Sequence, residues 1–285
     1  MDNKVEQLIN EYEKNIENTK EHFSYINSVR EFNGYIFKKM RHKEYLENEE
    51  KWLKKLMNMD YCVPKLIGVH NNIIITEKID GETIRDDKAQ KHLYNIGQLI
   101  ANLHNVPIEQ KEDWKKRLML KYIKLKESAK DIMETNIFEL TTNFLEQCLE
   151  NIKVSNLCIV HKDIRPENII FSNGKYYLID LESMCIGDRD YDFTRILNLL
   201  NQKEFYCYED FKNLIDGYRS IKDVDIKEEK WQFYNRYYAF RLYSRMLSGE
   251  IDRDNKYEKY LKDVLLDKND RVTDWIKKYN VEESL

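Results

Sequence analysis

Proline and glycine are scarce in this sequence, with three and eight residues respectively in a chain of 285. This scarcity excludes collagen-like and Pro/Gly-rich low-complexity architectures, and the sequence has no internal repeat or low-complexity linker. No apolar run approaches the length of about 20 residues that a membrane-spanning helix needs. The polar N-terminal stretch, residues 1–10, has no signal-peptide pattern. We therefore expect a cytoplasmic chain that has no membrane partner.

Cysteine is also sparse, and the five residues form no C-x-x-C pair: Cys62, Cys148, Cys158, Cys185 and Cys207. An odd number of scattered cysteines predicts reduced thiols and argues against both a disulfide framework and a zinc site. The formal net charge of −4 comes without a clustered basic segment, so we expect no nucleic-acid partner. A hydrophobic content of 42% in a chain of this length is enough for one large domain or two modest lobes.

The most informative stretch runs from Val160 to Glu182 and reads V-H-K-D-I-R-P-E-N-I-I-F-S-N-G-K-Y-Y-L-I-D-L-E. Three short apolar runs in or beside it predict strands: 158–160, 169–171 and 176–179. Asn173-Gly174 between the last two predicts a two-residue hairpin turn. Asp163, Asn168 and Asp180 then fall at strand ends or in the loop.

These three residues suit phosphoryl transfer, which needs a carboxylate for the proton of the attacking hydroxyl and oxygen ligands for Mg²⁺. Asp163 is the candidate base, and Asn168 and Asp180 are the candidate metal ligands. The alternative interpretation is a hairpin whose acidic residues are solvated turn residues. A single D-x-x-x-x-N match would favour that alternative, whereas the combined string is much more specific.

The strings H-K-D-I-R-P-E-N-I-I and L-I-D resemble the catalytic loop and the metal-binding Asp of the protein-kinase-like fold. Residues 178–197, with I-D-L-E, G-D and Y-D, resemble the aminoglycoside phosphotransferase and choline kinase group. Protein kinases carry D-F-G where this chain has Asp180-Leu181-Glu182, and no A-P-E signature follows. The resemblance also implies that Arg165 lies near the transferred phosphate, with a loop-bracing role as the equal alternative.

The resemblance implies that Lys38, in a predicted strand at residues 35–40, binds nucleotide phosphates. Glu49 shares a helical face with Leu46, Leu53 and Leu56, so it points inward and needs a cation, for which Lys38 is the candidate. Lys39 faces the opposite side of the strand. Residues 18–23, where the family places a phosphate loop, contain no glycine. Residues 72–81 resemble the hinge strand that binds a purine, which makes Glu77 and Ile79 candidate cofactor-binding residues.

Further strands are expected at residues 23–29 and 63–68, and a turn at Asn33-Gly34. Helical periodicity predicts an N-terminal helix and a mostly helical remainder: 3–17, 86–104, two helices in 111–150, 190–200, 207–220, 227–248, 254–266 and 270–280. We expect His104 and His161 to make structural hydrogen bonds and His161 not to ligate a metal.

Several acidic residues closely follow the metal-binding Asp: Glu182, Asp188, Asp190 and Asp192. If they line the acceptor site, their negative field favours a cationic acceptor. We assign Glu182, Asp188 and Asp192 as candidate acceptor-binding residues. The alternative is that Asp190 and Asp192 stabilise a helix N-terminus and that the remaining charges belong to an ordinary surface.

We therefore expect an α+β, two-lobed, protein-kinase-like fold. Residues 1–80 form a nucleotide-binding lobe with a small antiparallel sheet, and residues 81–285 form a mostly helical catalytic and acceptor-binding lobe. The implied activity is ATP- or GTP-dependent, Mg²⁺-dependent phosphorylation of a hydroxyl on a small cationic molecule. An aminoglycoside, as in antibiotic resistance, is favoured over choline or another amino alcohol, homoserine or a sugar. A protein kinase and a nucleotide-binding pseudoenzyme are further alternatives, and the oligomeric state stays open.

Overall fold

The computed structural model describes residues 3–22, 27–109, 113–154, 157–268 and 270–283. The chain forms two compact units, each built from two segments of sequence. Residues 1–89 and 161–185 form the first, which we call the sheet unit. Residues 90–160 and 186–285 form the second, the helical unit. The functional division into lobes near residue 80 stays a prediction.

The sheet unit contains a five-stranded antiparallel sheet with the strand order β1-β2-β3-β5-β4. Its strands are β1 (Lys20–His22), β2 (Ser28–Phe32), β3 (Tyr35–Lys39), β4 (Leu66–His70) and β5 (Ile73–Glu77). Asn33 and Gly34 join β2 to β3 with φ values of 48° and 78°, as a type I′ hairpin turn requires. A three-stranded sheet, β6-β8-β9, comprises Glu82–Thr83, Ile169–Ser172 and Lys175–Leu178.

Helices cover the first sheet because their apolar faces match its side chains. Helix α1 (Asn3–Lys14) buries Val5, Ile9 and Tyr12, and the Tyr12 ring stacks on Phe37 with 4.1 Å between centroids. Helix α2 (Lys43–Met57) buries its own apolar face within the same unit. In the described part of the chain, the 3-10 turns are η1 (Ile16–Asn18), η2 (Asp86–His92), η3 (Pro166–Asn168) and η4 (Leu181–Ser183).

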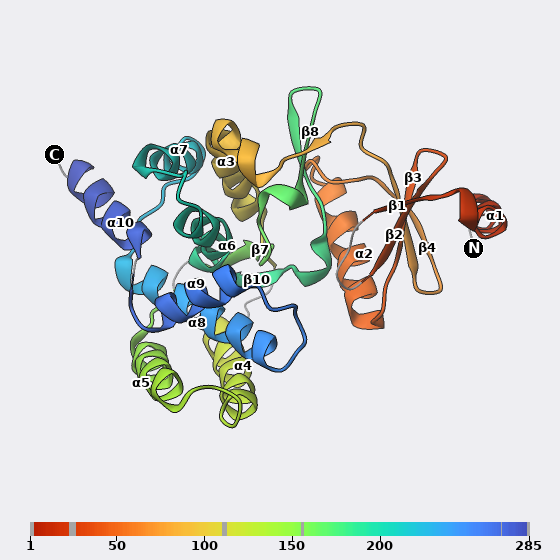
Figure 1. The fold of residues 1–285 in the computed structure, drawn as a ribbon. Coiled ribbons are helices and arrows are strands. Elements are labelled where there is room, and N and C mark those ends of the chain that lie inside the picture. The colour runs from red at the N-terminus through yellow and green to blue at the C-terminus, as the bar shows by residue number, and fades with distance from the viewer. Residues whose placement is uncertain (1–2, 23–26, 110–112, 155–156, 269, 284–285) are drawn as a thin grey trace. The chain divides into compact units, whose positions relative to one another are not determined.

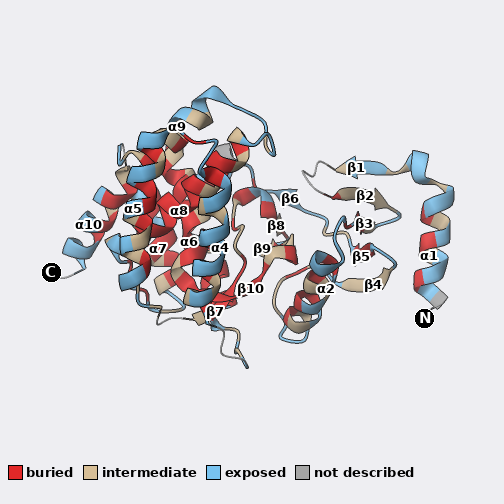
Figure 2. Cartoon of the chain, turned by 90° about the horizontal axis from the view of Figure 1, so that it is seen from below, coloured by how far each residue is buried: buried red, intermediate tan, exposed pale blue. Residues whose placement is uncertain are grey.

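The helical unit surrounds a two-stranded sheet of β7 (Leu157–Val160) and β10 (Cys185–Asp188). Its helices are α3 (Leu93–Asn105), α4 (Trp114–Ala129), α5 (Thr135–Asn151), α6 (Arg189–Gln202), α7 (Tyr208–Arg219), α8 (Glu228–Leu247), α9 (Asn255–Leu265) and α10 (Arg271–Glu282). Helix α8 is buried along most of its length, whereas α4 has a buried and an exposed face (Figure 2). Helices α3 and α7 pack backbone against backbone at Gly97 and Gly217, where any side chain would clash.

Most predicted elements are present, whereas several strands differ from expectation, among them β6 and β10, which the sequence did not predict. The strand predicted at residues 23–29 runs instead from Ser28 to Phe32, while residues 23–26 lie outside the described ranges. The strand predicted at 63–68 is β4, Leu66–His70. Residues Lys20–His22, within the expected phosphate-loop segment, form β1 because they pair with β2, and Phe23 lies outside the described ranges.

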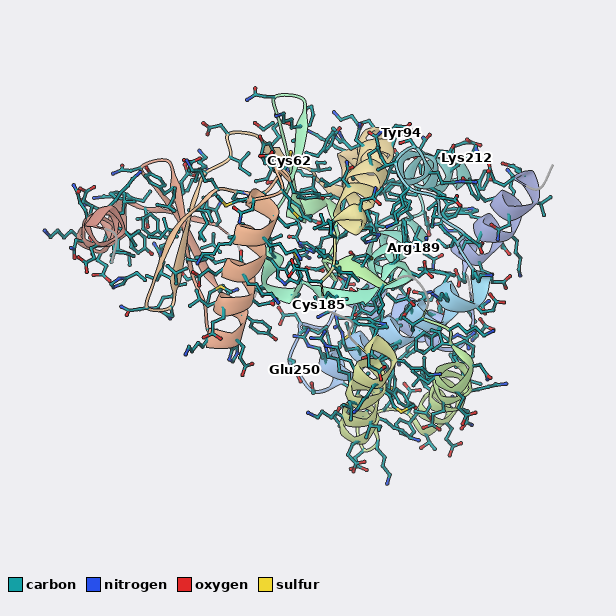
Figure 3. The ribbon with its side chains drawn as sticks, turned by 180° about the vertical axis from the view of Figure 1, so that it is seen from behind. Cys62, Tyr94, Cys185, Arg189, Lys212 and Glu250 are labelled. Atoms are coloured by element: carbon teal, nitrogen blue, oxygen red, sulfur yellow. The ribbon has the colours of Figure 1, made fainter. Side chains whose placement is uncertain are left out.

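Two global expectations concern membranes and thiols. Among the described residues, the structure contains no helix both long and apolar enough to cross a bilayer. All five cysteines are free, and Figure 3 labels Cys62 and Cys185. Cys158 is buried, and burial raises the pKa of its thiol. Cys158 is therefore a packing residue and not a reactive nucleophile.

Candidate active site

His161 braces the loop that carries the candidate base. Its side chain is fully buried, and Nε2 donates a hydrogen bond of 3.0 Å to the Ile179 carbonyl. Its Nδ1 accepts a hydrogen bond of 3.3 Å from the Asp163 backbone N–H. Between them, Lys162 has a φ of 71°, which turns the chain sharply before Asp163. The expected structural role of His161 is confirmed, because both ring nitrogens bind backbone groups.

Asn168 lies against Asp163 and orients it. The Asn168 side-chain amide donates to the Asp163 carbonyl at 2.9 Å and to Asp163 Oδ2 at 3.1 Å. Pro166 starts the 3-10 turn that makes this approach possible. In turn, the Ile179 N–H donates to the Asn168 carbonyl at 3.0 Å, so the residue after Ile179 lies beside Asn168. That residue is Asp180, and the loop and the hairpin therefore bring the three predicted residues together.

Asp180 sits in a left-handed backbone conformation with φ 65° and ψ 59°. Its Oδ1 accepts a hydrogen bond of 2.5 Å from Lys38 Nζ. Burial alone would raise the pKa of Asp180, but the charge and the hydrogen bond of Lys38 outweigh burial and lower it. Asp180 is therefore ionised at neutral pH and offers carboxylate oxygen to a cation.

Lys38 contacts three carboxylates. Its Nζ lies 2.7 Å from Glu49, 2.5 Å from Asp180 and 3.0 Å from Glu182. Burial would lower the pKa of Lys38, yet these carboxylates together raise it, so the ammonium stays charged. Burial raises the pKa of Glu49, with Lys38 opposing that shift. Lys38 is buried and its neighbour Lys39 is exposed, so the expected facing of β3 is confirmed.

Asn27, which the sequence did not single out, holds Glu182 in place. Its Nδ2 donates to Glu182 Oε2 at 2.7 Å, and its Oδ1 accepts from the Arg41 N–H at 3.3 Å. Asn27 thus joins the start of β2, the end of β3 and the η4 turn. Nothing in the sequence around residue 27 indicated this role, because the contact spans 155 positions.

Asn48 and Trp52, also missed, fasten α2 to the turn that follows Asp180. Asn48 Nδ2 donates to the carbonyls of Glu182 at 2.8 Å and Met184 at 2.9 Å. Trp52 Nε1 donates to the same Met184 carbonyl at 3.1 Å. These bonds hold α2 in place, so that Glu49, the residue after Asn48 on the same helix, stays within reach of Lys38. The i, i+4 spacing of Asn48 and Trp52 was the only available signal.

The three aspartates after Glu182 bind partners within the helical unit. Asp188 accepts from Lys230 at 2.9 Å and from the Tyr234 hydroxyl at 2.8 Å, and Asp190 lies 2.8 Å from Lys230. Asp188 also caps α6 by accepting from the Asp190 N–H. The side chain of Arg189, labelled in Figure 3, donates to Asp190 at 3.1 Å.

Asp192 is paired with His104 Nε2 at 3.2 Å, and both side chains are fully buried. His104 Nδ1 lies 3.0 Å from the Tyr218 hydroxyl, which confirms the structural role expected for His104. Glu182 differs from the aspartates because it contacts Lys38 in the sheet unit. An acceptor-binding role for Glu182, Asp188 or Asp192 stays a prediction.

The candidate hinge lies at the end of β5. Glu77 is the last residue of the strand, is exposed, and pairs with Lys65 at 3.4 Å. Within the described residues, neither backbone group of Ile79 hydrogen-bonds to the protein. Arg165 Nε lies 3.5 Å from Asp163 Oδ2, so this guanidinium accompanies the candidate base.

The donor set fits a hard divalent cation. The Asn168 side-chain nitrogen donates its hydrogen bonds to Asp163. The Oδ1 atom of Asn168 is therefore the atom that can ligate a metal. Asp180 adds a carboxylate, and oxygen ligands of this kind suit Mg²⁺. Oxygens of Glu49, Asp180 and Glu182 also lie within 4.8 Å of one another, but Lys38 contacts all three. The ammonium of Lys38 is therefore already the cation that this second group binds, and it offsets part of the group's negative charge.

Comparison with known proteins places this arrangement in context. A sequence model of the phosphotransferase enzyme family matches residues 24–220. A protein of Mycoplasma capricolum called "Protein LicA homolog" is 27% identical over 169 residues, which is 59% of this chain and 67% of that protein.

Two solved structures share the fold. Choline kinase LicA from Streptococcus pneumoniae superposes with a TM-score of 0.67 at 20% identity, covering 90% of this chain and 97% of that one. The ternary complex of APH(2″)-IIa with streptomycin and ATP superposes with a TM-score of 0.67 at 18% identity, covering 94% and 97%. The expected protein-kinase-like fold, with its antiparallel sheet and many helices, is confirmed by these likenesses.

Proposed function

The chain belongs to the phosphotransferase enzyme family and is a small-molecule kinase, and we propose that it transfers the γ-phosphoryl group of ATP to the hydroxyl of a choline-type amino alcohol. The LicA name of the Mycoplasma relative, together with the choline kinase fold of the pneumococcal LicA, supports this acceptor. The ATP-containing APH(2″)-IIa complex supports the choice of nucleotide.

The hydrogen bonding of Asn168 carries the proposal. Its side chain binds Asp163, and its backbone accepts from the residue before Asp180. A single residue therefore sets the spacing between a carboxylate suited to a hydroxyl proton and a carboxylate suited to a metal. A solvated turn would not place a buried asparagine between two such acids.

In the proposed reaction, Asp163 accepts the proton of the acceptor hydroxyl as the oxygen attacks the γ-phosphorus. The bond between the γ-phosphorus and the bridging oxygen breaks, and ADP leaves. Lys38, oriented by Glu49 and Glu182, offers its ammonium to the phosphate oxygens. Arg165, beside Asp163, adds positive charge where the transferred group carries negative charge.

Asn168 Oδ1 and the Asp180 carboxylate would hold the Mg²⁺ that accompanies ATP. When bound, the ion neutralises phosphate charge. Asp180 also fixes Lys38 through the 2.5 Å hydrogen bond, so the metal ligand and the phosphate-binding cation have a defined separation. The free backbone groups of Ile79 and the strand end at Glu77 are the proposed contacts for the purine.

A nucleotide-consumption assay tests the proposal. Purified protein with Mg-ATP is incubated with choline, ethanolamine, streptomycin, gentamicin, homoserine and a neutral sugar, and ADP release is compared with release without acceptor. We expect choline-type amino alcohols to give the highest kcat/KM, and mass spectrometry to detect the phosphorylated acceptor. If none of these compounds stimulates ADP release, or if only the neutral sugar does, the proposal is contradicted.

An aminoglycoside is the second candidate, because the streptomycin–ATP complex shares the fold over 94% of this chain. The same assay separates the two candidates, since each compound is tested alone and as a competitor. Asp163→Asn serves as the control for every acceptor. Turnover that survives in this variant would come from a contaminating kinase or from a different catalytic residue.

A further inference from the structure

Within the described residues, the protein covers only one of the two apolar faces of helix α4. Trp114, Leu118, Tyr122 and Ala129 are buried on the inner face. Met119, Leu120 and Ile123 lie on the outer face, with 40%, 54% and 55% of their surface exposed. One apolar face is sufficient to hold a surface helix on its core, so the second requires another explanation.

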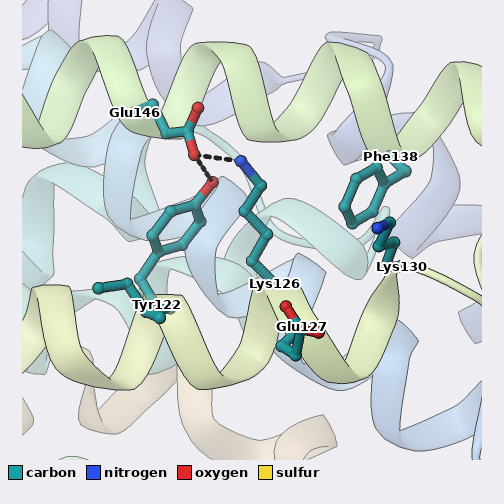
Figure 4. A pocket seen from close by; sticks show the side chains of 7 residues that line it. Tyr122, Lys126, Glu127, Lys130, Phe138 and Glu146 are labelled. Atoms are coloured by element: carbon teal, nitrogen blue, oxygen red, sulfur yellow. Dashed lines mark hydrogen bonds and ion pairs between the residues drawn. The ribbon is translucent and has the colours of Figure 1, made fainter.

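The inner face fixes the orientation of α4. Trp114 Nε1 donates to the Tyr234 hydroxyl at 3.1 Å, which anchors the first turn to α8. Toward the other end, the Tyr122 hydroxyl and Lys126 Nζ both reach Glu146 of α5, as the dashed lines in Figure 4 show. The exposed apolar side chains therefore point away from the core of the helical unit.

The same helix is strongly basic although the whole chain has a formal net charge of −4. Its sequence, WKKRLMLKYIKLKESA, contains six Lys or Arg residues and a single acid, Glu127. Lys116 and Lys124 are exposed beside Leu120 and Ile123 at helical spacing. Among the described residues, neither lysine side chain has an ion-pair or hydrogen-bond partner.

We propose that the outer face of α4, formed by Lys116, Met119, Leu120, Ile123 and Lys124, docks on an anionic lipid surface. Aliphatic side chains at the centre of a helix face enter the boundary between headgroups and acyl chains. Lys116, which lies on the same side of the helix as Leu120 and Ile123, and Lys124, which lies beside Leu120, attract acidic headgroups. The helix lies in the plane of the membrane and crosses nothing, so the proposal is compatible with the absence of a spanning helix among the described residues.

Two other ligand classes fit this face less well. Single-stranded nucleic acid uses aromatic stacking platforms, whereas the exposed side chains here are aliphatic. A small molecule would need the adjacent groove of about 400 Å³ between α4 and α5. Figure 4 shows that the ion pair of Lys126 with Glu146 crosses this groove, so a ligand would have to displace an existing interaction.

Vesicle flotation with the full-length protein tests the proposal directly. Vesicles of phosphatidylcholine alone are compared with vesicles containing about 30% phosphatidylglycerol, at low and high salt. We expect binding to the anionic vesicles, little binding to the neutral ones, and weaker binding as salt screens the lysines. Equal binding to both kinds of vesicle, or no binding to either at low salt, overturns the proposal.

Paired variants identify the surface. Lys116→Gln with Lys124→Gln should weaken binding about 25-fold, since each lysine near an anionic surface contributes roughly fivefold. Leu120→Ser with Ile123→Ser should weaken it at least about tenfold, through lost apolar burial. The control for the lysine pair is Lys256→Gln with Lys259→Gln, two exposed lysines three positions apart on α9. The control for the apolar pair is Phe205→Ser, because the Phe205 side chain is 49% exposed. Controls that weaken binding as much as the α4 variants place the contact elsewhere and overturn the proposal.

A soluble polyanion distinguishes lipid from an acidic macromolecule. Polyglutamate or RNA is added to the bound vesicles, and direct binding of each to the protein is measured. If polyanion binding depends on the lysines but not on Leu120 and Ile123, the face recognises charge alone and the lipid proposal fails. Kinase turnover and melting temperature of the variants, expected to be unchanged, show that the fold is intact. Vesicle binding is measured without turnover, so its failure is independent of the proposed acceptor.

Discussion

Lys38 and Asp180 share a hydrogen bond of 2.5 Å although 142 positions separate them in the chain. The ammonium of Lys38 also contacts Glu49 and Glu182, which leaves little freedom to the side chain. The carboxylates around Lys38 raise its pKa, so the ammonium is charged at neutral pH. The chain thus maintains a fixed, buried cation next to its candidate metal ligand, which is what nucleotide phosphates require.

Removal of this cation should weaken nucleotide binding and turnover together. We expect Lys38→Ala to raise the KM for ATP about tenfold or more and to lower kcat, because hydrogen bonds to charged groups are among the strong ones. The exposed neighbour provides the control, and Lys39→Ala should leave both constants nearly unchanged. Initial rates at varied ATP concentration measure both. The reverse ranking of the two variants would mean that Lys39 faces the nucleotide.

Asp163 should matter for chemistry and little for nucleotide binding. We expect Asp163→Asn to lower kcat about a hundredfold or more, the usual contribution of a positioned general base. The KM for ATP should stay within about twofold, because the proposed partner of Asp163 is the acceptor hydroxyl and not the nucleotide. Asp252→Asn, at an exposed position, is the control. A variant that keeps near-normal turnover removes Asp163 from the mechanism.

Asp180→Asn should abolish Mg²⁺-dependent turnover while preserving the fold. Asparagine tolerates the left-handed backbone at this position, so the substitution tests charge and not conformation. We expect less than about 1% of normal activity and a higher Mg²⁺ requirement for any residual rate. Titration of Mg²⁺ at saturating ATP measures the requirement, and circular dichroism verifies the fold. An unchanged Mg²⁺ dependence would show that the metal is held by other groups.

The sequence predicted the local part of this site because a motif encodes it. Asp163, Asn168 and Asp180 lie on one loop and one hairpin. For Lys38 the strand pattern alone favoured a surface lysine, and the inward-facing Glu49 on the next helix indicated the buried pair that the structure contains. Asn27 was missed because its role depends on tertiary contacts 155 positions away, to which no spacing rule applies. Short polar strands such as β1, Lys20–His22, were missed because three residues contain too little periodicity.

The acidic residues after Asp180 show the other limit of sequence reasoning. Glu182 and Asp188 are close in sequence, yet Glu182 contacts Lys38 and Asp188 contacts Lys230, on α8. The partner of a buried carboxylate is a long-range property, and Lys230 lies 42 positions from Asp188. The run of acidic residues therefore predicted a local negative charge, but it could not indicate which cationic side chains pair with each carboxylate.

Asn27 should influence nucleotide binding through Glu182. We expect Asn27→Ala to raise the KM for ATP about five- to tenfold, because Glu182 loses its 2.7 Å hydrogen bond and orients Lys38 less well. Asn27→Asp should have a larger effect, since it places a second carboxylate against Glu182. The KM values of both variants, measured beside wild type, test this order. Equal effects of the two substitutions would mean that Asn27 only supports the backbone at Arg41.

Lys230 is the cation whose loss should destabilise the helical unit. Asp188 is fully buried, so Lys230→Met leaves it without its charge partner, at a cost of roughly 3–5 kcal/mol in unfolding free energy. Burial and the repulsion of Asp190 already raise the pKa of Asp188, with Lys230 opposing them. Without Lys230 the folded-state pKa rises further above its unfolded value. The stability of the variant is therefore best at low pH and is lost as pH rises through that folded-state pKa.

Urea unfolding at pH 5 and pH 8 tests this sign. The deficit of Lys230→Met relative to wild type should be larger at pH 8, and Asp188→Asn in the same chain should restore part of it. Lys227→Met is the matched control, because its ion pair with Asp225 is exposed and exposed pairs contribute about 0–1 kcal/mol. A deficit of the same size at both pH values would mean that the variant loses packing around Tyr234 and not the compensation of a buried charge.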